Sequence, residues 1–389
     1  MIVGILKEIK AEENRVCMSP GGVEFMRQRG HQILVEKNAG KASAFTDATY
    51  QKAGAEIVDA PKDIFKRAKM IMRVKEPQPF ELALIRKGQI YFSYLHLAAS
   101  ETLTRALIKR KAVCIAYETI QKADGTLPLL TPMSEVAGPM AIQQGAKYLE
   151  MAQGGHGVLL GGVPGVDPAT VVIIGGGAVG INAAKMASGL GAKVYILDID
   201  LERLRYLSDV MSGQCVTLMS SPAAIRDVLP RADLVVGAVL VPGSKTPTLV
   251  TREMLGTMKK GAVLVDVSID QGGCFETSRE TTHADPIYEV DGIVHYAVSN
   301  MPGALPRTST LALNNATLPY AAEIAGKGWK KAMKENPEIK AGANIVEGKV
   351  TYKGVAEAFG LKYERIKKLL ELGFRVQRFR GSGLRAVCR

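Results

Sequence analysis

Residues 171–180 read Val171-Val172-Ile173-Ile174-Gly175-Gly176-Gly177-Ala178-Val179-Gly180, an apolar strand followed by the pattern G-x-G-x-x-G. A helix is predicted directly after this pattern, over residues 181–190. Gly175 permits a tight turn, Gly177 lets a pyrophosphate approach the backbone, and Gly180 lets the helix pack closely on the strand. The start of the helix, near Ala178, offers free N–H groups and a partial positive charge to phosphates. The stretch therefore predicts a dinucleotide-binding turn.

The kind of dinucleotide is indicated by Asp198, which ends the next predicted strand about twenty residues further on. A carboxylate at this point binds ribose hydroxyls and repels a 2′-phosphate, so NAD is favoured over NADP. Arg203 lies nearby and weakens that preference. The alternative is a glycine-rich turn in an unrelated α/β fold, and the order strand, turn, helix, strand and acid argues against it.

The chain as a whole alternates strands with helical segments, which is typical of an α/β protein with parallel sheets. Strands of the first half are predicted at residues 2–6, 32–36, 70–74, 90–94 and 113–117. A second series is predicted at 171–174, 194–197, around Val216, and at 234–241, 262–267 and 293–298. Six parallel strands in this order predict a doubly wound sheet.

Helices are expected over residues 132–151, over 309–325 with a kink at Pro319, and near 363–372. A hairpin is expected around Glu347-Gly348. The helical segments after residue 306 indicate that the chain crosses back to its first domain. We therefore expect a discontinuous domain of residues 1–129 and 307–389 around a middle domain of residues 130–306.

Ligands of open α/β sheets bind at the carboxyl ends of the strands, near the point where the strand order reverses. In the second series this rule selects Ser220, Val239, Leu240, Val267, Asp270 and Asn300. Asp270 is the most interesting of them, because a carboxylate at a strand end can take part in chemistry. Its alternative role is a helix cap or a loop contact.

The same rule selects Arg15, Lys75, His96 and Glu118 in the first half. An arginine holds a carboxylate with a bidentate fork, a lysine adds a point charge, and a histidine moves protons near neutral pH. Taken singly, Arg15 could be a surface charge, Lys75 a solvated strand end and His96 a histidine at the edge of the core. Together they predict a pocket for a small carbonyl acid.

Composition favours a globular protein: 47% of the 389 residues are hydrophobic and 23% are charged. No apolar run is long enough for a membrane helix or for the core of a signal peptide, so we expect a cytoplasmic protein. The net charge of +12 raises the possibility of a nucleic-acid partner, but five arginines of this excess lie in the last fifteen residues. The five cysteines are scattered and suggest neither a zinc site nor a disulfide framework.

Several longer blocks resemble the bacterial alanine dehydrogenases, in unbroken order to about residue 370. In the first half they are Met1-Ile2-Val3-Gly4-Ile5-Leu6-Lys7-Glu8, Glu13-Asn14-Arg15-Val16, Val74-Lys75-Glu76-Pro77 and Tyr94-Leu95-His96-Leu97. Further along they are Leu130-Thr131-Pro132-Met133-Ser134-Glu135-Val136-Ala137-Gly138, Asp266-Val267-Ser268-Ile269-Asp270-Gln271-Gly272-Gly273 and Asn300-Met301-Pro302-Gly303-Ala304. The resemblance implies two doubly wound Rossmann-like domains, separated by a cleft and joined by long helices. It also implies a homo-oligomer, usually a hexamer.

The resemblance assigns roles to individual residues of this chain. Arg15 and Lys75 would hold the substrate carboxylate and oxygen, and His96 and Asp270 would be the acid/base residues. The implied cofactor contacts are Ser134, Asp198, Arg203, Ser220, Val267, Ser268, Ile269, Asp270, Arg279, Val298, Ser299, Asn300 and Met301. Some relatives place a magnesium ion on an acid and a histidine of the C-terminal helix. Here Glu323 is followed by Lys327 at the histidine position, so no metal is predicted.

The implied reaction is the NAD-dependent interconversion of L-alanine with pyruvate and ammonia. Two alternatives share the architecture: a soluble subunit of a nicotinamide nucleotide transhydrogenase, and a dehydrogenase joining lysine to a keto acid. A third alternative is a basic, non-catalytic protein that binds NAD or RNA. The arginine-rich end motivates it, but no basic patch interleaved with aromatic residues supports it, and no nucleic-acid or membrane partner is predicted.

Overall fold

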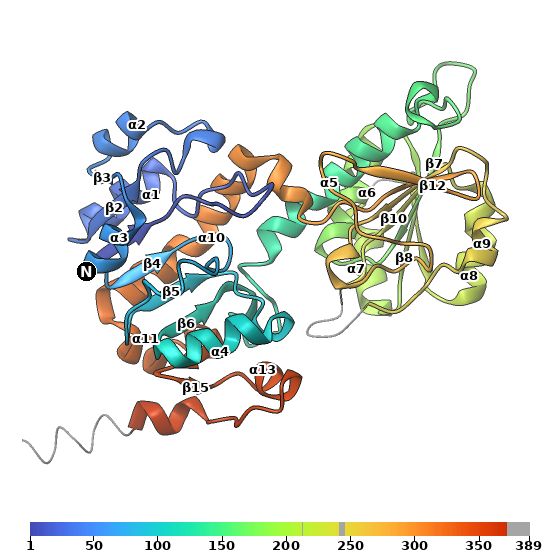
Figure 1. Ribbon diagram of the computed structural model, residues 1–389. Coiled ribbons are helices and arrows are strands. Elements are labelled where there is room, and N and C mark those ends of the chain that lie inside the picture. Colours follow the sequence, from blue (N-terminus) through green and yellow to red (C-terminus); the bar gives the residue numbers. More distant parts are fainter. Residues whose placement is uncertain (212, 241–245, 372–389) are drawn as a thin grey trace, which may run out of the picture. The chain divides into compact units, whose positions relative to one another are not determined.

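The computed structural model describes residues 1–211, 213–240 and 246–371, which form two compact units (Figure 1). Unit 1 comprises Met1–Pro132 and the described chain from Pro306 on, and unit 2 comprises Met133–Leu305. Each boundary falls in the first turn of a long helix, α5 (Thr131–Tyr148) or α10 (Pro306–Lys327). Proline suits that turn because its missing N–H would have no partner inside the helix. The arginine-rich end beyond residue 371 lies outside the described residues.

Unit 1 is built on a sheet that has eight strands in the described part of the chain. The strands, in spatial order, are β15 (Lys349–Val350), β14 (Ala343–Val346), β6 (Val113–Ala116), β5 (Ile90–Ser93), β4 (Met70–Met72), β1 (Ile2–Ile5), β2 (Gln32–Glu36) and β3 (Glu56–Val58). From β6 to β3 all neighbours are parallel, whereas β14 runs antiparallel to β6 and β15 antiparallel to β14. The five predicted strands and the hairpin at Glu347-Gly348 are confirmed. The short β3 was missed because only one of its three residues is buried.

Helices cover this sheet by burying apolar side chains on it. Ile64 of α3 and Leu107 of α4 pack in one cluster with Leu6 and Tyr91. The helices of unit 1 besides α10 are α1 (Pro20–Gln28), α2 (Asp47–Lys52), α3 (Pro61–Arg67), α4 (Glu101–Arg110), α11 (Trp329–Glu335), α12 (Pro337–Ala341) and α13 (Lys353–Ala358). Short 3₁₀ turns in the described part of unit 1 are η1 (Lys41–Ser43), η2 (Leu97–Ala99) and η3 (Tyr117–Thr119). A further helix begins at residue 366, three residues later than predicted, and residue 372 lies outside the described residues.

The returning helix α10 is tied to the N-terminal segment by polar bonds as well as by packing. The Thr310 hydroxyl accepts a hydrogen bond from the Val16 N–H at 3.0 Å, and the Asn314 side chain accepts one from the Ser19 N–H at 3.1 Å. Thr310 and Asn314 are both buried. Buried polar groups need such partners, so this register of α10 against the segment after β1 is fixed.

Unit 2 contains a second sheet, with seven strands in the described residues. The strands, in spatial order, are β12 (Ile287–Val290), β13 (Ile293–Tyr296), β11 (Val263–Asp266), β10 (Leu234–Gly237), β7 (Thr170–Ile174), β8 (Lys193–Asp198) and β9 (Cys215–Met219). The six predicted parallel strands are confirmed, but β10 ends at Gly237 rather than at residue 241, which lies outside the described residues. The antiparallel β12 was missed. Its signal is Asp291-Gly292, a two-residue turn with positive φ at both positions.

Both faces of this sheet are covered, as the doubly wound prediction requires. Alternate residues of β7 enter different cores: Val171 and Ile173 pack in one cluster, and Val172 and Ile174 in another. Helices α5 and α6 supply side chains to the first cluster, and α8 and α9 supply side chains to the second. The helices of unit 2 besides α5 are α6 (Ala178–Gly189), α7 (Leu201–Val210), α8 (Pro222–Val228) and α9 (Arg252–Leu255), with 3₁₀ turns η4 (Met151–Gln153), η5 (Leu229–Arg231), η6 (Ile269–Gln271) and η7 (Met301–Ala304).

Both units therefore have the predicted α/β class with Rossmann-like, mainly parallel sheets. The strand order reverses at β7 in unit 2 and at β1 in unit 1. Ligands of open α/β sheets bind at the carboxyl ends of the strands beside such a reversal. Within the described residues, no helix is both long enough and apolar enough to cross a lipid bilayer.

Candidate functional site

The turn between β7 and α6 has the geometry expected from its glycines. Gly175 adopts a φ of +105°, which side chains rarely allow, and a Cβ there would lie 2.5 Å from the Ala238 carbonyl oxygen. A Cβ on Gly180 would lie 1.9 Å from the Gly175 carbonyl oxygen. A Cβ on Gly177, by contrast, would meet no described atom within 4 Å. Gly177 is also the N-cap of α6 and provides no side-chain cap, so the start of this helix is open to an anion.

Asp198 and Arg203 both bind this glycine turn. Asp198, the last residue of β8, accepts hydrogen bonds from the Gly176 N–H at 2.6 Å and from the Asp200 N–H at 2.9 Å. A carboxylate has about four acceptor positions, so Asp198 keeps capacity for ribose hydroxyls. The Arg203 Nε donates to the Gly176 carbonyl at 2.6 Å. Arg203 thus supports the turn, a role that the sequence analysis did not foresee.

The other candidates of unit 2 follow the carboxyl ends of the same parallel strands. Beyond the glycine turn after β7 and the acid of β8, they are Ser220 after β9, Val239 and Leu240 after β10, Val267, Ser268, Ile269 and Asp270 after β11, and Val298, Ser299, Asn300 and Met301 after β13. Ser134 lies in the first turn of α5, and Arg279 follows β11 in the chain. Since these strands are parallel, the candidates that follow them share one edge of the sheet.

Hydrogen bonds connect several of these strand ends. The Ser220 N–H donates to the Asp198 carbonyl at 2.8 Å. The Ser268 hydroxyl accepts from the Val239 N–H at 3.0 Å and donates to the Val239 carbonyl at 2.8 Å. The Asp270 carboxylate accepts from the Asn300 N–H at 3.3 Å, and Asn300 has a left-handed backbone with φ 54°. Hydrogen bonds thus link neighbouring segments that follow the strands at the carboxyl edge of this sheet.

Arg279 is held by the strand that the sequence analysis missed. Its N–H donates to the hydroxyl of Tyr288 in β12 at 2.7 Å, and its guanidinium carbon lies 4.1 Å from the centre of the Tyr288 ring. The hairpin β12–β13 therefore positions one of the candidate cofactor residues.

A buried acid that was not predicted supports the turn carrying Asp270. Asp266, the last residue of β11, is 1% exposed. Its carboxylate accepts from the Ser268 N–H at 3.0 Å, the Cys274 N–H at 2.9 Å and the Ser278 hydroxyl at 2.5 Å. Burial raises its pKa although these donors oppose the shift. An acid inside the apolar run Val263–Asp266 was the signal that could have revealed it.

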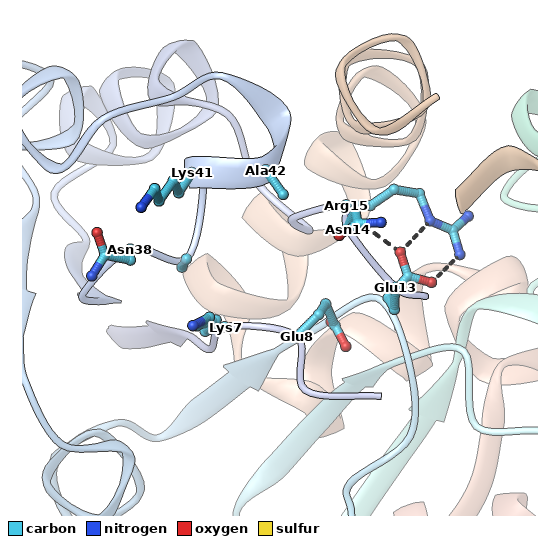
Figure 2. A pocket seen from close by; sticks show the side chains of 9 residues that line it. Lys7, Glu8, Glu13, Asn14, Arg15, Asn38, Lys41 and Ala42 are labelled. Carbon is cyan, nitrogen blue, oxygen red and sulfur yellow. Dashed lines mark hydrogen bonds and ion pairs between the residues drawn. The ribbon is translucent and has the colours of Figure 1, made fainter. Parts of the chain in front are cut away.

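In unit 1, Arg15 is buried and paired with Glu13. Arg15 is 2% exposed, and its Nε and Nη2 donate to the two Glu13 carboxylate oxygens at 2.7 Å and 2.5 Å (Figure 2). Burial opposes ionisation of Glu13, but the hydrogen bonds and the charge of Arg15 outweigh burial and lower the Glu13 pKa to about 2. The alternative reading of Arg15 as a surface charge is therefore wrong. Glu13 was the unrecognised partner, two residues away in the same motif.

Glu13 and Arg15 line a pocket of about 400 Å³ near the ends of β1 and β2. The other lining residues are Lys7, Glu8, Asn14, Asn38, Ala39, Lys41 and Ala42. In Figure 2 the Glu13 carboxylate faces the Arg15 guanidinium, and Lys41 and Asn38 stand on the opposite side of the pocket. Charged groups of both signs converge here, which suits a small zwitterionic or anionic molecule.

Lys75 follows β4 and is anchored through its backbone. Its N–H and that of Val74 donate to one Glu8 carboxylate oxygen at 3.4 Å and 2.6 Å. Burial raises the Glu8 pKa to about 7, although the charge of Arg73 opposes the shift. Arg73 is fully buried and donates to Glu8, to Glu81 and to the Lys7 carbonyl. This buried cluster joins the loop after β1 to the loop after β4.

His96 follows β5 and projects an exposed side chain from a left-handed backbone, with φ 46° and ψ 41°. Its ring stacks on that of Tyr94 at a centroid distance of 6.0 Å. Tyr94 is itself fixed by a hydrogen bond from its hydroxyl to the Leu129 carbonyl at 2.5 Å. Arg15, Lys75 and His96 thus all follow carboxyl ends of parallel strands of one sheet.

At the end of α10, Lys327 bonds to Glu323 at 2.8 Å and to Glu335 of α11 at 2.9 Å. The Asn336 side chain donates to the other Glu323 oxygen at 2.8 Å. The ammonium group of Lys327 therefore lies between the carboxylates of Glu323 and Glu335, which would otherwise attract a metal cation. In the described residues, no three His, Cys, Asp or Glu side chains gather as a metal site requires.

Replacing Glu13 by glutamine is expected to lower the free energy of unfolding of unit 1 by about 3 kcal/mol at pH 7. The native pKa of about 2 lies below the ordinary value of 4.5, so the pair contributes fully above pH 4.5 and loses its contribution as the pH falls toward 2. Urea unfolding, followed by the fluorescence of the single tryptophan, Trp329 of α11, measures this across the pH range.

The control for this prediction is Glu24→Gln, which changes an exposed carboxylate on α1. It should leave the pH profile as in the wild type. A Glu13→Gln variant that loses stability between pH 5 and pH 2 as steeply as the wild type would contradict the assignment.

Comparison with known proteins shows similarity along nearly the whole chain. Two family models match the chain. The one described as "Alanine dehydrogenase/PNT, N-terminal domain" matches residues 4–137, and the one described as "Alanine dehydrogenase/PNT, C-terminal domain" matches residues 141–353. An alanine dehydrogenase of Methanococcus maripaludis is 56% identical over 371 residues, which are 95% of this chain and 100% of the relative. An alanine dehydrogenase of Halomonas elongata is 53% identical over 370 residues, with the same coverage of 95% and 100%.

Solved structures agree with these sequence matches. One described as L-alanine dehydrogenase superposes with a TM-score of 0.90 at 48% identity and covers 92% of this chain and 99% of its own. A transhydrogenase from Sinorhizobium meliloti has a TM-score of 0.78 at 24% identity, covering 91% and 99%, which is a likeness of fold.

Proposed function

Because the chain belongs to the alanine dehydrogenase/PNT family, we propose that it catalyses the reversible, NAD-dependent oxidative deamination of L-alanine to pyruvate and ammonia. The observation that carries the proposal is the full-length similarity to proteins named alanine dehydrogenase. The charged strand ends of unit 1 and the glycine turn of unit 2 are the parts that such a reaction needs.

The cofactor residues proposed in unit 2 fit a dinucleotide. The open N-terminus of α6 would hold the pyrophosphate, and Asp198 would accept the ribose hydroxyls. When bound, this cofactor would supply a hydride acceptor for the Cα of alanine, and loss of the hydride would leave the substrate as an iminium open to water.

Substrate binding is assigned to Arg15 and Lys75. Glu13 binds the Nε and Nη2 of Arg15 and so fixes the orientation of its guanidinium. A guanidinium and an ammonium group suit a carboxylate, the anionic group of alanine and pyruvate.

Proton transfer is assigned to His96 and Asp270. Between them they accept the proton that water loses on attacking the iminium carbon, and they return a proton to the departing amine. The Asn300 N–H donor to Asp270 and the Tyr94 ring beside His96 limit how these two side chains are placed.

The first test is the appearance of NADH absorbance with purified protein, NAD and L-alanine at alkaline pH. Reduction of NAD by alanine, and not by lysine, is expected, with NADP a much poorer acceptor. Oxidation of NADH by lysine together with a keto acid, without reduction of NAD by alanine, would replace the proposal by the lysine-type reaction. Hydride exchange between NADH and an NADP analogue without alanine would replace it by a transhydrogenase activity.

Asp198→Asn is expected to shift the ratio of the NADPH to the NADH dissociation constant by about 100-fold in favour of NADPH. Removing the charge weakens two charge-assisted bonds to the ribose and the repulsion of a 2′-phosphate. The amide oxygen still accepts from the Gly176 N–H, so the turn should survive. Titration of cofactor fluorescence measures both constants.

The matched control is Asp209→Asn, which changes an exposed acid on α7. It should leave the ratio unchanged. An unchanged ratio in Asp198→Asn itself would remove Asp198 from the proposed NAD site.

We also propose that the chain acts as a cytoplasmic homo-oligomer, a hexamer as in the proteins it resembles. Light scattering of the purified protein during gel filtration gives the mass of the particle. A mass near that of one chain would remove this part of the proposal.

A further inference from the structure

The backbone of His96 is held in a conformation that an L-amino acid adopts at a cost. Its φ of 46° and ψ of 41° lie in the left-handed region, which costs a residue with a Cβ about 1–2 kcal/mol relative to the right-handed region. His96 is exposed, so packing of its own side chain in the core does not force this conformation. A strained backbone persists only where surrounding groups stabilise it, so other residues must hold His96 in the left-handed region.

The Glu118 carboxylate binds this piece of backbone. The His96 N–H donates to Glu118 Oε1 at 2.7 Å, and the Leu95 N–H lies 3.2 Å from both oxygens. Two consecutive backbone N–H groups that bind one anion form a concave site, and a left-handed residue is part of such a site. Charge-assisted bonds are about twice as strong as neutral ones, so one carboxylate can offset the cost of the left-handed residue.

The fold brings the two residues together from separate strands. Glu118 lies in η3, directly after β6, and His96 lies three residues after the end of β5. These strands are parallel and pair Ser93 with Ala116, so their ends lie side by side. The rings of Tyr94 and Tyr117 meet edge to face at 5.1 Å between the same two ends and keep them in register.

We propose that Glu118 is a positioning residue of the reaction, which acts through His96 by fixing the left-handed backbone from which the imidazole projects. The inference rests on the proposed function, because it takes His96 to be an acid/base residue. Glu118 bonds to the main chain of residues 95 and 96, so its effect on the imidazole is one of placement. The charged strand ends of unit 1 thus fall into two kinds: those proposed to meet the substrate, and Glu118, which orients His96.

The test is a double-mutant cycle of Glu118→Ala and His96→Ala, measured as kcat for alanine oxidation. Misplacing a reacting group by about 1 Å can cost on the order of 100-fold, so Glu118→Ala alone should lower kcat by about 10- to 100-fold. In the His96→Ala background, Glu118→Ala should change kcat by less than about twofold, because the group it positions is gone. Equal losses in both backgrounds would overturn the proposal.

Further variants separate this role from a general effect on folding. Glu118→Gln keeps the length of the side chain and one acceptor oxygen, so it should recover part of the lost kcat. The dissociation constant of NADH, proposed to bind unit 2, should stay within about twofold in all variants. Glu101→Gln, an exposed acid at the start of α4, is the matched control and should behave as the wild type.

A crystal structure of Glu118→Ala makes the two proposals distinguishable. A positive φ at His96 with the imidazole still stacked on Tyr94 would overturn the role of Glu118, whatever the activity. Failure of the wild-type protein to oxidise alanine would instead count against the proposed function. A backbone at residue 96 that leaves the left-handed region is the expected result.

Discussion

Replacement of His96 by alanine is expected to lower kcat for alanine oxidation by about 10²–10⁴-fold, the contribution of a positioned acid or base. The dissociation constant of NADH should stay within about twofold of the wild type, because the proposed NAD residues lie in unit 2 and His96 lies in unit 1. Stopped-flow or steady-state absorbance gives the first quantity, and NADH fluorescence gives the second. Parallel losses in turnover and in binding would count against an acid/base role.

A second substitution at the same position separates chemistry from backbone conformation. Glycine adopts the left-handed region without the strain that alanine meets there. If the imidazole carries out proton transfer, His96→Gly should be as slow as His96→Ala. Recovery of activity in the glycine variant would mean that the turn itself matters rather than the ring.

Replacement of Arg73 by methionine is expected to destabilise unit 1 by about 3–5 kcal/mol at pH 7. Arg73 is fully buried, and its loss leaves the carboxylates of Glu8 and Glu81 in the interior without their cation. Without Arg73 the native pKa of Glu8 rises above its value of about 7, so the native state takes up protons more readily than the unfolded chain. The deficit should therefore shrink as the pH falls from 7 to 5. Urea unfolding followed by Trp329 fluorescence measures it.

Two controls accompany this prediction. Arg67→Met removes an exposed arginine that pairs with Glu56, and it should cost no more than about 1 kcal/mol. The triple variant Arg73→Met, Glu8→Gln, Glu81→Gln removes the unbalanced charges and should regain most of the lost stability. An Arg73→Met protein as stable as Arg67→Met would show that the buried cluster contributes little.

The fold could be predicted where the signal is local. The strand β7, its glycine turn and helix α6 are adjacent in the sequence, and an apolar run followed by spaced glycines leaves few other structures. The strand β12 was not predicted because it is short and half-exposed, and the pair Asp291-Gly292 is its only local signal. The helix after Thr131 was extended three residues too far, since the sequence does not show that a separate 3₁₀ turn begins at Met151.

The candidate site was predictable as a set of positions but not as a set of contacts. Strand ends selected Lys75, His96 and Asp270, because parallel strands bring their carboxyl ends to one edge. The partners Glu8, Glu118 and Asn300 come from other strand ends, and nothing in a single sequence reports such pairings. The same limit applies to Arg203, whose bond to the Gly176 carbonyl depends on how α7 lies over the glycine turn.

The division of unit 1 between two distant segments has a consequence for synthesis on the ribosome. When residues 1–132 have emerged, β6 still lacks its neighbour β14, and Val16 and Ser19 lack the side chains of α10 that accept their N–H groups. Unit 2 is continuous in sequence and can fold while the rest of the chain is being made. At about 5–20 residues per second, the nascent first segment therefore waits many seconds with an open strand edge, a natural substrate for chaperones.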